Sequence, residues 1–423
     1  MYAHQLAAKP ADVKLPLAFI LTGLIALILS QLLLLTHGSL LLDEMYRSPI
    51  IWTSAHLFVI GWASMVAKGA MYQLVPVAFQ VSIYSKRLGY LHFGCMVAGL
   101  FGFSIGFLTF SRLVSIFSGL VLVMGFFFFI GNMVYAFKQI KKWNMIAINV
   151  LSALISLTLT ILIGFILIWQ LTQGGLAFQY HLPLLYTHIT LGIGAWFSLL
   201  IIGFSYKLVP MFTLSHGYSM RMSVPIFILS VGGLTLFILS YFTQAQVLFF
   251  CGALVFSPAF ILFGLHIYQI WQRRMRRRSD LGVKYAFVAI AFGVLCTLLL
   301  TVQSGHYLYQ NELSSSSFLF GLVYLYLMGW VTLSIMGYLF KIVPFLWWTQ
   351  KYSDKAGTAQ VPTLKEMIDE RLGRYIFPAF ILGIVLVTTS IWVKSTALFY
   401  ISQSMVVLLC LPYSWLIFSV LKK

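Results

Sequence analysis

Charged residues are scarce in this sequence, and acidic residues are the scarcest. Only 9% of the 423 residues are charged and nine are Asp or Glu, whereas a soluble globular domain averages about 25% charged residues. This scarcity excludes an ordinary soluble domain. Cysteine is also rare, and its spacing fits neither a disulfide framework nor a zinc site. We expect small buried side chains at Cys95, Cys251, Cys296 and Cys410.

Long apolar segments fill most of the chain. The sequence is 61% hydrophobic and its mean hydropathy is +0.96. The apolar runs are long enough to cross a hydrocarbon core about 30 Å thick. We therefore predict an all-α polytopic membrane protein, a single membrane domain over residues 1–423 in the lipid bilayer. Its twelve transmembrane helices are expected at 15–36, 50–79, 88–109, 112–137, 145–169, 184–214, 222–242, 245–271, 285–303, 316–347, 375–394 and 396–420.

The formal net charge of +18 indicates a membrane orientation and not a nucleic-acid partner. In the twelve-span arrangement, 21 of the 27 Lys and Arg residues lie on the side that holds both termini. The positive-inside rule then predicts a plasma-membrane protein with its N-terminus and C-terminus in the cytoplasm. The Arg-rich run from Arg273 to Arg278 acts as a topology determinant in this interpretation; attraction of anionic headgroups is the alternative.

One stretch of sixteen residues occurs three times. Each copy has a Trp, a Ser or Thr two residues later, a Gly seven residues after the Trp, and a Pro seven residues after the Gly. The copies are equally spaced, which predicts three internal repeats of four spans each, 1–142, 143–278 and 279–423. We expect the Trp residues to pack in a three-fold core and the Gly residues to allow close helix approach. The copies are GWASMVAKGAMYQLVP, AWFSLLIIGFSYKLVP and GWVTLSIMGYLFKIVP.

Three lysines and one loop segment complete the pattern. Lys68, Lys207 and Lys341 fall within spans. A buried ionisable residue is a functional candidate by default, but a lysine can also reach along its helix to the headgroups, so their roles stay open. In the longest inner loop, Thr363 followed by Glu366 resembles a capping box and predicts a short amphipathic helix over 363–374.

Twelve spans in three groups of four resemble the plan of the haem-copper oxidase catalytic subunit, subunit I. The tenth span, LVYLYLMGWVTLSIMGYLFKIVPFL, is similar to the corresponding helix of cbb-type oxidases. The sixth span, with its Tyr-Lys-Leu-Val-Pro end followed by Tyr-Ser-Met-Arg, is similar to the same subfamily. The resemblance implies a haem-copper oxidase subunit I-like fold and a place in the respiratory chain beside other respiratory-complex subunits.

The sequence departs from that family at most metal ligands. The resemblance would place two histidines of the tenth helix, which bind the high-spin and low-spin haems, at positions occupied by Leu322 and Tyr324. The seventh span, 222–242, has none of the histidines that bind copper in the family. We therefore expect no binuclear haem-copper centre and no bound copper, and we assign no catalytic residue.

Two histidines remain as candidate ligands. The resemblance implies that His56 is the axial metal ligand of one b-type haem, with Tyr324, water or another residue on the opposite side. His188 lies near the family's copper-ligand position, displaced by two residues. The alternative for each histidine is structural, a neutral imidazole bonded to a backbone carbonyl or hydroxyl group. Tyrosine can also bind haem iron, so the candidate cofactor-binding residues are His56, Tyr324 and His188.

Three functions are consistent with the sequence. The first is a haem-binding membrane protein for redox chemistry, gas sensing or electron transfer. The second is a non-catalytic protein without haem that serves assembly, partner binding or small-molecule transport. The third, an active terminal oxidase or nitric oxide reductase, conflicts with the missing ligands, so enzyme activity rests on family resemblance alone. The chain contains no cytochrome c attachment motif and no soluble redox domain.

Overall fold

The computed structural model describes residues 13–174, 178–276, 280–310 and 316–423. Within these ranges twelve helices are long and apolar enough to cross a membrane, as predicted. They are formed by α1 (Lys14–Thr36); α3 (Pro49–His56), η1 (Leu57–Ser64) and α4 (Met65–Phe79); α5 (Lys86–Leu108); α6 (Arg112–Lys138); α7 (Met145–Gln173); α8 (His181–Ile189), η3 (Thr190–Phe197) and α9 (Ser198–Thr213); α10 (Ser223–Thr243); α11 (Gln246–Gln272); α12 (Leu281–Gln310); α13 (Ser316–Leu325), η4 (Tyr326–Thr332) and α14 (Leu333–Tyr352); α15 (Glu370–Trp392); and α16 (Thr396–Ser419).

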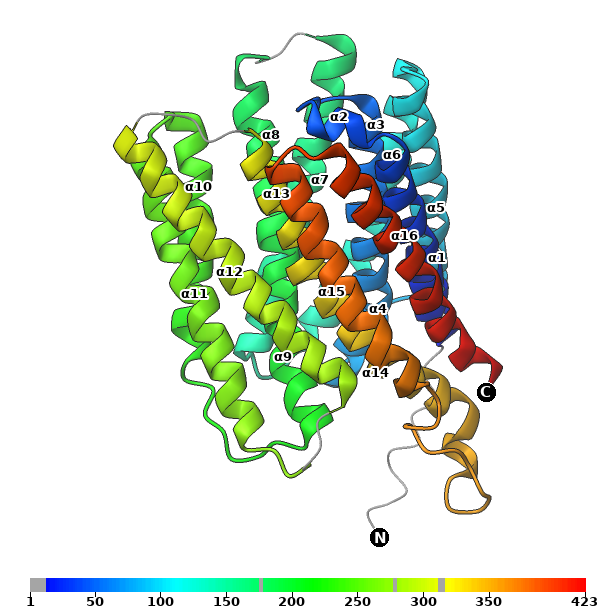
Figure 1. Ribbon diagram of the computed structural model, residues 1–423. Helices are drawn as coiled ribbons and strands as arrows, with labels where there is room; N and C mark the ends of the chain where they lie inside the picture. The colour runs from blue at the N-terminus through cyan, green and yellow to red at the C-terminus, as the bar shows by residue number, and fades with distance from the viewer. Residues whose placement is uncertain (1–12, 175–177, 277–279, 311–315) are drawn as a thin grey trace.

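The spans that carry the repeated stretch are the most buried of the bundle. In Figure 1, α12, α15 and α16 cross the front, and α4, α9 and α14 lie behind them. Each of these central helices packs against the first helix of its own group of four, α4 on α1, α9 on α7 and α14 on α12. The same contact between the first helix and the central helix therefore recurs in all three groups.

Glycine sets the distance between these helix pairs. A Cβ atom added to Gly337 on α14 would lie 2.7 Å from the backbone carbonyl oxygen of Gly282 on α12. Gly69 and Gly203 meet α1 and α7 in the same way, with added Cβ atoms 2.6 Å from the Phe19 Cβ and 2.9 Å from the Asn149 Cβ. The close helix approach predicted for the glycines of the repeat is therefore present at all three positions.

The predicted helix over 363–374 is wrong. The Glu366 carboxylate does accept the backbone N–H of Thr363, at 2.7 Å, as a capping box requires. However, residues 363–369 form no helix, and 370–374 belong to the eleventh span, which begins at Glu370 instead of 375. Asp369 is the reason, because its carboxylate accepts the backbone N–H groups of Arg371 and Leu372 and so caps α15 at this point.

The two ends of the bundle differ in charge. We call the end at which α1 begins and α16 ends the basic end; it lies at the bottom of Figure 1. At the opposite end, Lys394 forms an ion pair with Glu44 at 2.8 Å, and Ser317 donates a hydrogen bond to the same carboxylate. The Lys394 and Ser317 hydrogen bonds lower the pKa of Glu44, and the bond to Glu44 raises the pKa of Lys394.

Candidate functional site

Each central span contains a π-helical segment. The segments η1, η3 and η4 interrupt the second, sixth and tenth spans at similar places, and each contains one Trp of the repeat. A π-helix closes its hydrogen bonds one residue later than an α-helix, and such segments are frequent at functional sites. Hydropathy carries no trace of this change in backbone bonding, so the sequence analysis did not find it.

The three tryptophans form a closed ring of hydrogen bonds. Each indole N–H donates to the hydroxyl group that follows the Trp of another span by two residues. All three indoles are buried. The bonds run from Trp62 to Thr332 at 3.2 Å, from Trp196 to Ser64 at 3.2 Å, and from Trp330 to Ser198 at 3.3 Å.

Ser198 has a second partner in this ring. Its hydroxyl also bonds the phenol of Tyr326 at 2.5 Å. A buried indole N–H needs an acceptor, and the ring supplies one to every tryptophan. We interpret the ring as the packing core that was predicted for these residues, because its indole N–H groups are all satisfied within the chain.

His56 and His188 lie beside each other. Their ring centres are 6.5 Å apart and their planes differ by 31°. His56 ends α3 directly before η1, and His188 lies near the end of α8, two residues before η3. The structure therefore brings together two candidate ligands from different repeats, far apart in the sequence.

Both imidazoles are held by backbone carbonyl groups. The Nδ1 atom of His56 lies 2.7 Å from the carbonyl oxygen of Trp52, and that of His188 lies 2.9 Å from the carbonyl oxygen of Thr160. Since a carbonyl oxygen only accepts, each Nδ1 carries the proton and each Nε2 presents a lone pair. Within the described part of the chain, neither Nε2 receives a hydrogen bond. Such carbonyl contacts were expected for structural histidines. The same contacts also orient histidines that bind a metal.

Apolar and small residues surround the pair. The His56 ring meets the edges of Phe103 and Phe107 on α5, at 5.3 and 5.6 Å between ring centres. On the other side, a Cβ atom added to Gly164 of α7 would lie 2.8 Å from the His188 ring. Gly164 therefore leaves the room that the His188 ring occupies. The sequence analysis missed these three neighbours, because they lie in spans without a polar signal.

The third candidate ligand, Tyr324, is used elsewhere. Its hydroxyl donates to the side chain of Gln403 on α16 at 3.3 Å. Gln403 in turn donates to the side chain and backbone of Gln31 on α1. This buried polar chain ties α13 to α16 and α1. The structure thus pairs His56 with His188, while the Tyr324 hydroxyl serves an inter-helix contact.

The donor set at the histidine pair is small. Among the described residues, no group of three or more His, Cys, Asp or Glu side chains could hold a metal ion. Two metal–nitrogen bonds of about 2.0–2.1 Å, with about 1.1 Å from each nitrogen to its ring centre, place ring centres about 6.3 Å apart across one metal. The observed ring-centre distance of 6.5 Å is close to this spacing.

A second buried polar cluster lies between α4, α5 and α6. The Lys68 side chain is fully buried, and its amine contacts the sulfur of Met96 at 3.5 Å and the ring of Phe126 at 3.9 Å. His92 is also fully buried, with Nδ1 bonded to the Tyr72 hydroxyl at 3.0 Å and no partner for Nε2 among the described residues. The sequence analysis left open that Lys68 reaches along its helix to the headgroups. Its full burial excludes that alternative.

Comparison with known proteins shows a likeness in fold. No family model and no curated protein matches the sequence. A solved structure described as "Cryo-EM structure of a heme-copper terminal oxidase dimer provides insights into its catalytic mechanism" is similar with a TM-score of 0.64 and 13% sequence identity, over 97% of this chain and 84% of that chain. At this identity the likeness concerns the fold alone. The protein is an all-α, multi-pass membrane protein with a haem-copper oxidase-like arrangement of helices.

Proposed function

We propose that this protein is a membrane haem protein in which His56 and His188 hold a single b-type haem. The observation that carries the proposal is the pair of carbonyl-oriented imidazoles, 6.5 Å apart, with both Nε2 lone pairs unused by the described chain. The similarity to an oxidase structure supports the scaffold. His56 keeps its predicted role, and His188 replaces Tyr324 as the preferred second ligand.

The residues around the pair perform the tasks that such a cofactor requires. The carbonyl oxygens of Trp52 and Thr160 fix the tautomer and orientation of the two rings. Phe103 and Phe107 keep water away from His56. When bound, the haem supplies a one-electron redox couple tuned by its axial ligands and their surroundings. We infer a role in electron transfer or redox sensing.

A terminal oxidase activity is not part of this proposal. Leu322 cannot ligate iron, and α10 contains no histidine. These sequence facts support a scaffold without the binuclear centre. The enrichment of Lys and Arg at the basic end supports a cytoplasmic location of both termini in the plasma membrane. Labelling of single introduced cysteines at residues 354 and 176 with an impermeant thiol reagent in intact cells would test that orientation.

The absorption spectrum of purified protein from haem-replete cells tests the function. We expect a Soret band and about one iron per chain, and the loss of that band in both His56→Ala and His188→Ala. His216→Ala is the matched control, since His216 is exposed in a loop. A colourless, iron-free preparation would refute haem binding, and one copper per chain would assign the pair to another metal. A band that survives His188→Ala but not His56→Ala would restore Tyr324 or water as the second ligand.

A further inference from the structure

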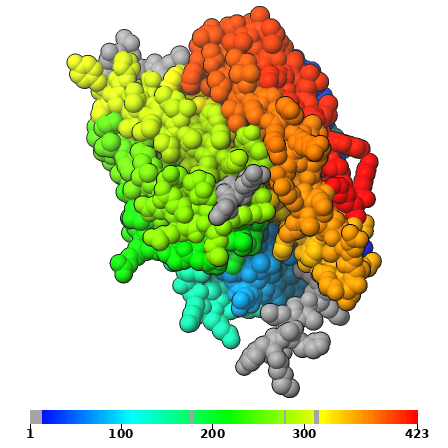
Figure 2. All heavy atoms as spheres, turned by 60° about the horizontal axis from the view of Figure 1, so that its bottom comes forward, coloured from blue at the N-terminus to red at the C-terminus, as the bar shows by residue number. Residues whose placement is uncertain are grey.

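A large cavity opens at the basic end, away from the histidine pair. Its volume is about 970 Å³, and it is lined by the end of α11, the start of α12, the start of α15 and the residues before α15. Figure 2 brings this end forward and shows α11 and α12 beside α15. Nothing in the proposed haem function uses this cavity.

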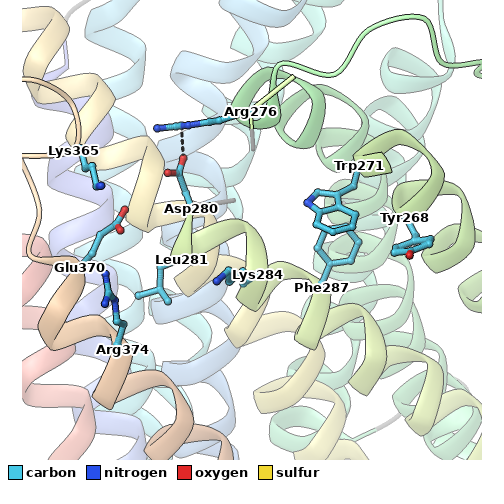
Figure 3. Close-up of a pocket in the computed structure, with 10 residues that line it drawn as sticks. All are labelled: Tyr268, Trp271, Arg276, Asp280, Leu281, Lys284, Phe287, Lys365, Glu370 and Arg374. Carbon is cyan, nitrogen blue, oxygen red and sulfur yellow. Dashed lines mark hydrogen bonds and ion pairs between the residues drawn. The ribbon is translucent and has the colours of Figure 1, made fainter. Parts of the chain in front are cut away.

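Basic side chains dominate the lining. Arg276, Lys284, Lys365 and Arg374 line the cavity together with two carboxylates (Figure 3). One carboxylate, Asp280, is already neutralised, because it pairs with Arg276 at 2.7 Å and with Lys341 of α14 at 2.6 Å. This pair also gives Lys341 a structural role.

The other three cations keep their charge available. Within the described ranges, no ion pair joins Lys284, Lys365 or Arg374 to a carboxylate. In addition, α12 and α15 both begin at the cavity, at Leu281 and Glu370. The dipole of a helix favours a negative charge at its start, although at α15 the Asp369 carboxylate already accepts two of the N–H groups. Among the described lining residues, cations therefore outnumber carboxylates.

Aromatic rings form the opposite wall. Trp271 meets Phe287 edge to face at 5.8 Å between ring centres, and it stacks on Tyr268 at 5.6 Å. Figure 3 shows the three rings on the side away from the charged group, with Tyr268 farthest from it. Trp and Tyr occupy the level of the lipid headgroups in membrane proteins. A ligand with an anionic head and an apolar body fits both walls.

Glu370 adds a requirement to the ligand. Its Oε1 atom is buried and has no hydrogen-bond partner among the described residues. A buried carboxylate oxygen without a donor is costly, and the nearby basic residues do not bond to it in this structure. A ligand hydroxyl group would supply the missing donor. A ligand that carries both a phosphate and a hydroxyl group would therefore match the basic residues and Glu370 together.

We propose that this cavity binds the headgroup of an anionic phospholipid that carries a free hydroxyl, of the phosphatidylglycerol type. Lys284, Lys365 and Arg374 contact the phosphate, and Glu370 accepts the headgroup hydroxyl. The acyl chains lie against the aromatic wall and leave between the helices into the bilayer. Basic pockets between transmembrane helices are a known form of headgroup recognition, and here the residues of one pocket are assigned.

Native mass spectrometry of the full-length protein in detergent tests the proposal. The probes are phosphatidylglycerol, phosphatidylcholine, phosphatidic acid and inorganic phosphate. We expect phosphatidylglycerol to bind at least ten-fold more tightly than phosphatidylcholine. In Lys284→Gln/Arg374→Gln this affinity should fall about 25-fold, since each basic residue contributes a factor of about five. In Glu370→Ala the preference for phosphatidylglycerol over phosphatidic acid should disappear.

A matched variant controls for charge and folding. Lys86→Gln/Arg87→Gln removes two cations at the start of α5, also at the basic end, and should leave lipid binding within two-fold of the wild type. Monodisperse elution and unchanged helicity establish that the variants fold. Equal binding of phosphatidylcholine, or equal loss in the control, would overturn the site. Inorganic phosphate that binds as tightly as the lipid would overturn the lipid as its ligand.

Discussion

The tryptophan ring allows a prediction with internal controls. Its three hydrogen bonds are chemically alike, but the hydroxyl groups differ in their number of aromatic partners. Ser198 accepts from Trp330 and also bonds Tyr326, whereas Ser64 accepts from Trp196. Ser198→Ala therefore removes the hydroxyl that both Trp330 and Tyr326 use, and Ser64→Ala removes the hydroxyl that Trp196 uses. Both changes remove one hydroxyl and almost no volume.

The expected magnitudes follow from this count. An orphaned buried donor costs about 1–3 kcal/mol in soluble proteins, but hydrogen bonds within membranes average only about 0.6 kcal/mol and reach about 1.7. We expect a loss of about 1 kcal/mol in the free energy of unfolding for Ser64→Ala and about 2 kcal/mol for Ser198→Ala. Thr332→Val, which keeps the shape while removing the acceptor of Trp62, should resemble Ser64→Ala.

Reversible unfolding in mixed detergent micelles is the assay. A double-mutant cycle of Trp196→Phe with Ser64→Ala isolates the bond from the change in ring volume, and we expect a coupling of about 0.5–1 kcal/mol. Our reasoning fails if Ser198→Ala costs no more than Ser64→Ala. A coupling below about 0.3 kcal/mol, which is within the error of additivity, would show that the ring contributes geometry without stability.

Three further changes test other parts of the structure. Gly337→Ala should lower the unfolding midpoint because the new methyl group meets a backbone carbonyl, whereas Gly94→Ala, with nothing within 4 Å, should not; equal midpoints contradict the close packing. Lys68→Met should raise the midpoint, because it removes a fully buried amine that has no carboxylate partner among the described residues; a lower midpoint would indicate a functional or paired lysine. Glu44 has a lowered pKa in the folded state, so its contribution to stability is present above about pH 4.3 and is lost as the pH falls below it. Lys394→Gln should flatten this acid-side loss in a pH series of thermal unfolding, and an unchanged slope would refute the pairing.

Sequence alone predicted the spans well, since a hydrocarbon core imposes length and polarity directly. The twelve helices and most of their bounds agree with the prediction. The errors occur where local bonding decides the outcome. Asp369 starts α15 five residues before the apolar run predicts it. The π segments are invisible to hydropathy, because they change the backbone partner and not the residue type.

The candidate site was predicted only in part. His56 and His188 could be selected as imidazoles within spans, but their proximity depends on how α3 and α8 meet across two repeats. The equal spacing of the repeats was the one available signal, since equivalent residues around a common axis lie at similar depths. It favoured Tyr324 equally, and only the bond to Gln403 distinguishes that side chain.

In the central helices, the tryptophans and the histidines differ in whether their side-chain nitrogens have hydrogen-bond partners. The indole N–H groups of the tryptophan ring all find acceptors within the chain. A few residues away, His56 and His188 each donate a hydrogen bond from Nδ1 to a carbonyl oxygen. The Nε2 atom of each ring has no hydrogen-bond partner in the described chain. Both histidines are half-buried, and neither Nε2 is among the fully buried atoms without a partner, so each lone pair is open to a ligand. The proposed metal centre between His56 and His188 would use both lone pairs, whereas a purely structural role accounts for the Nδ1 contacts alone.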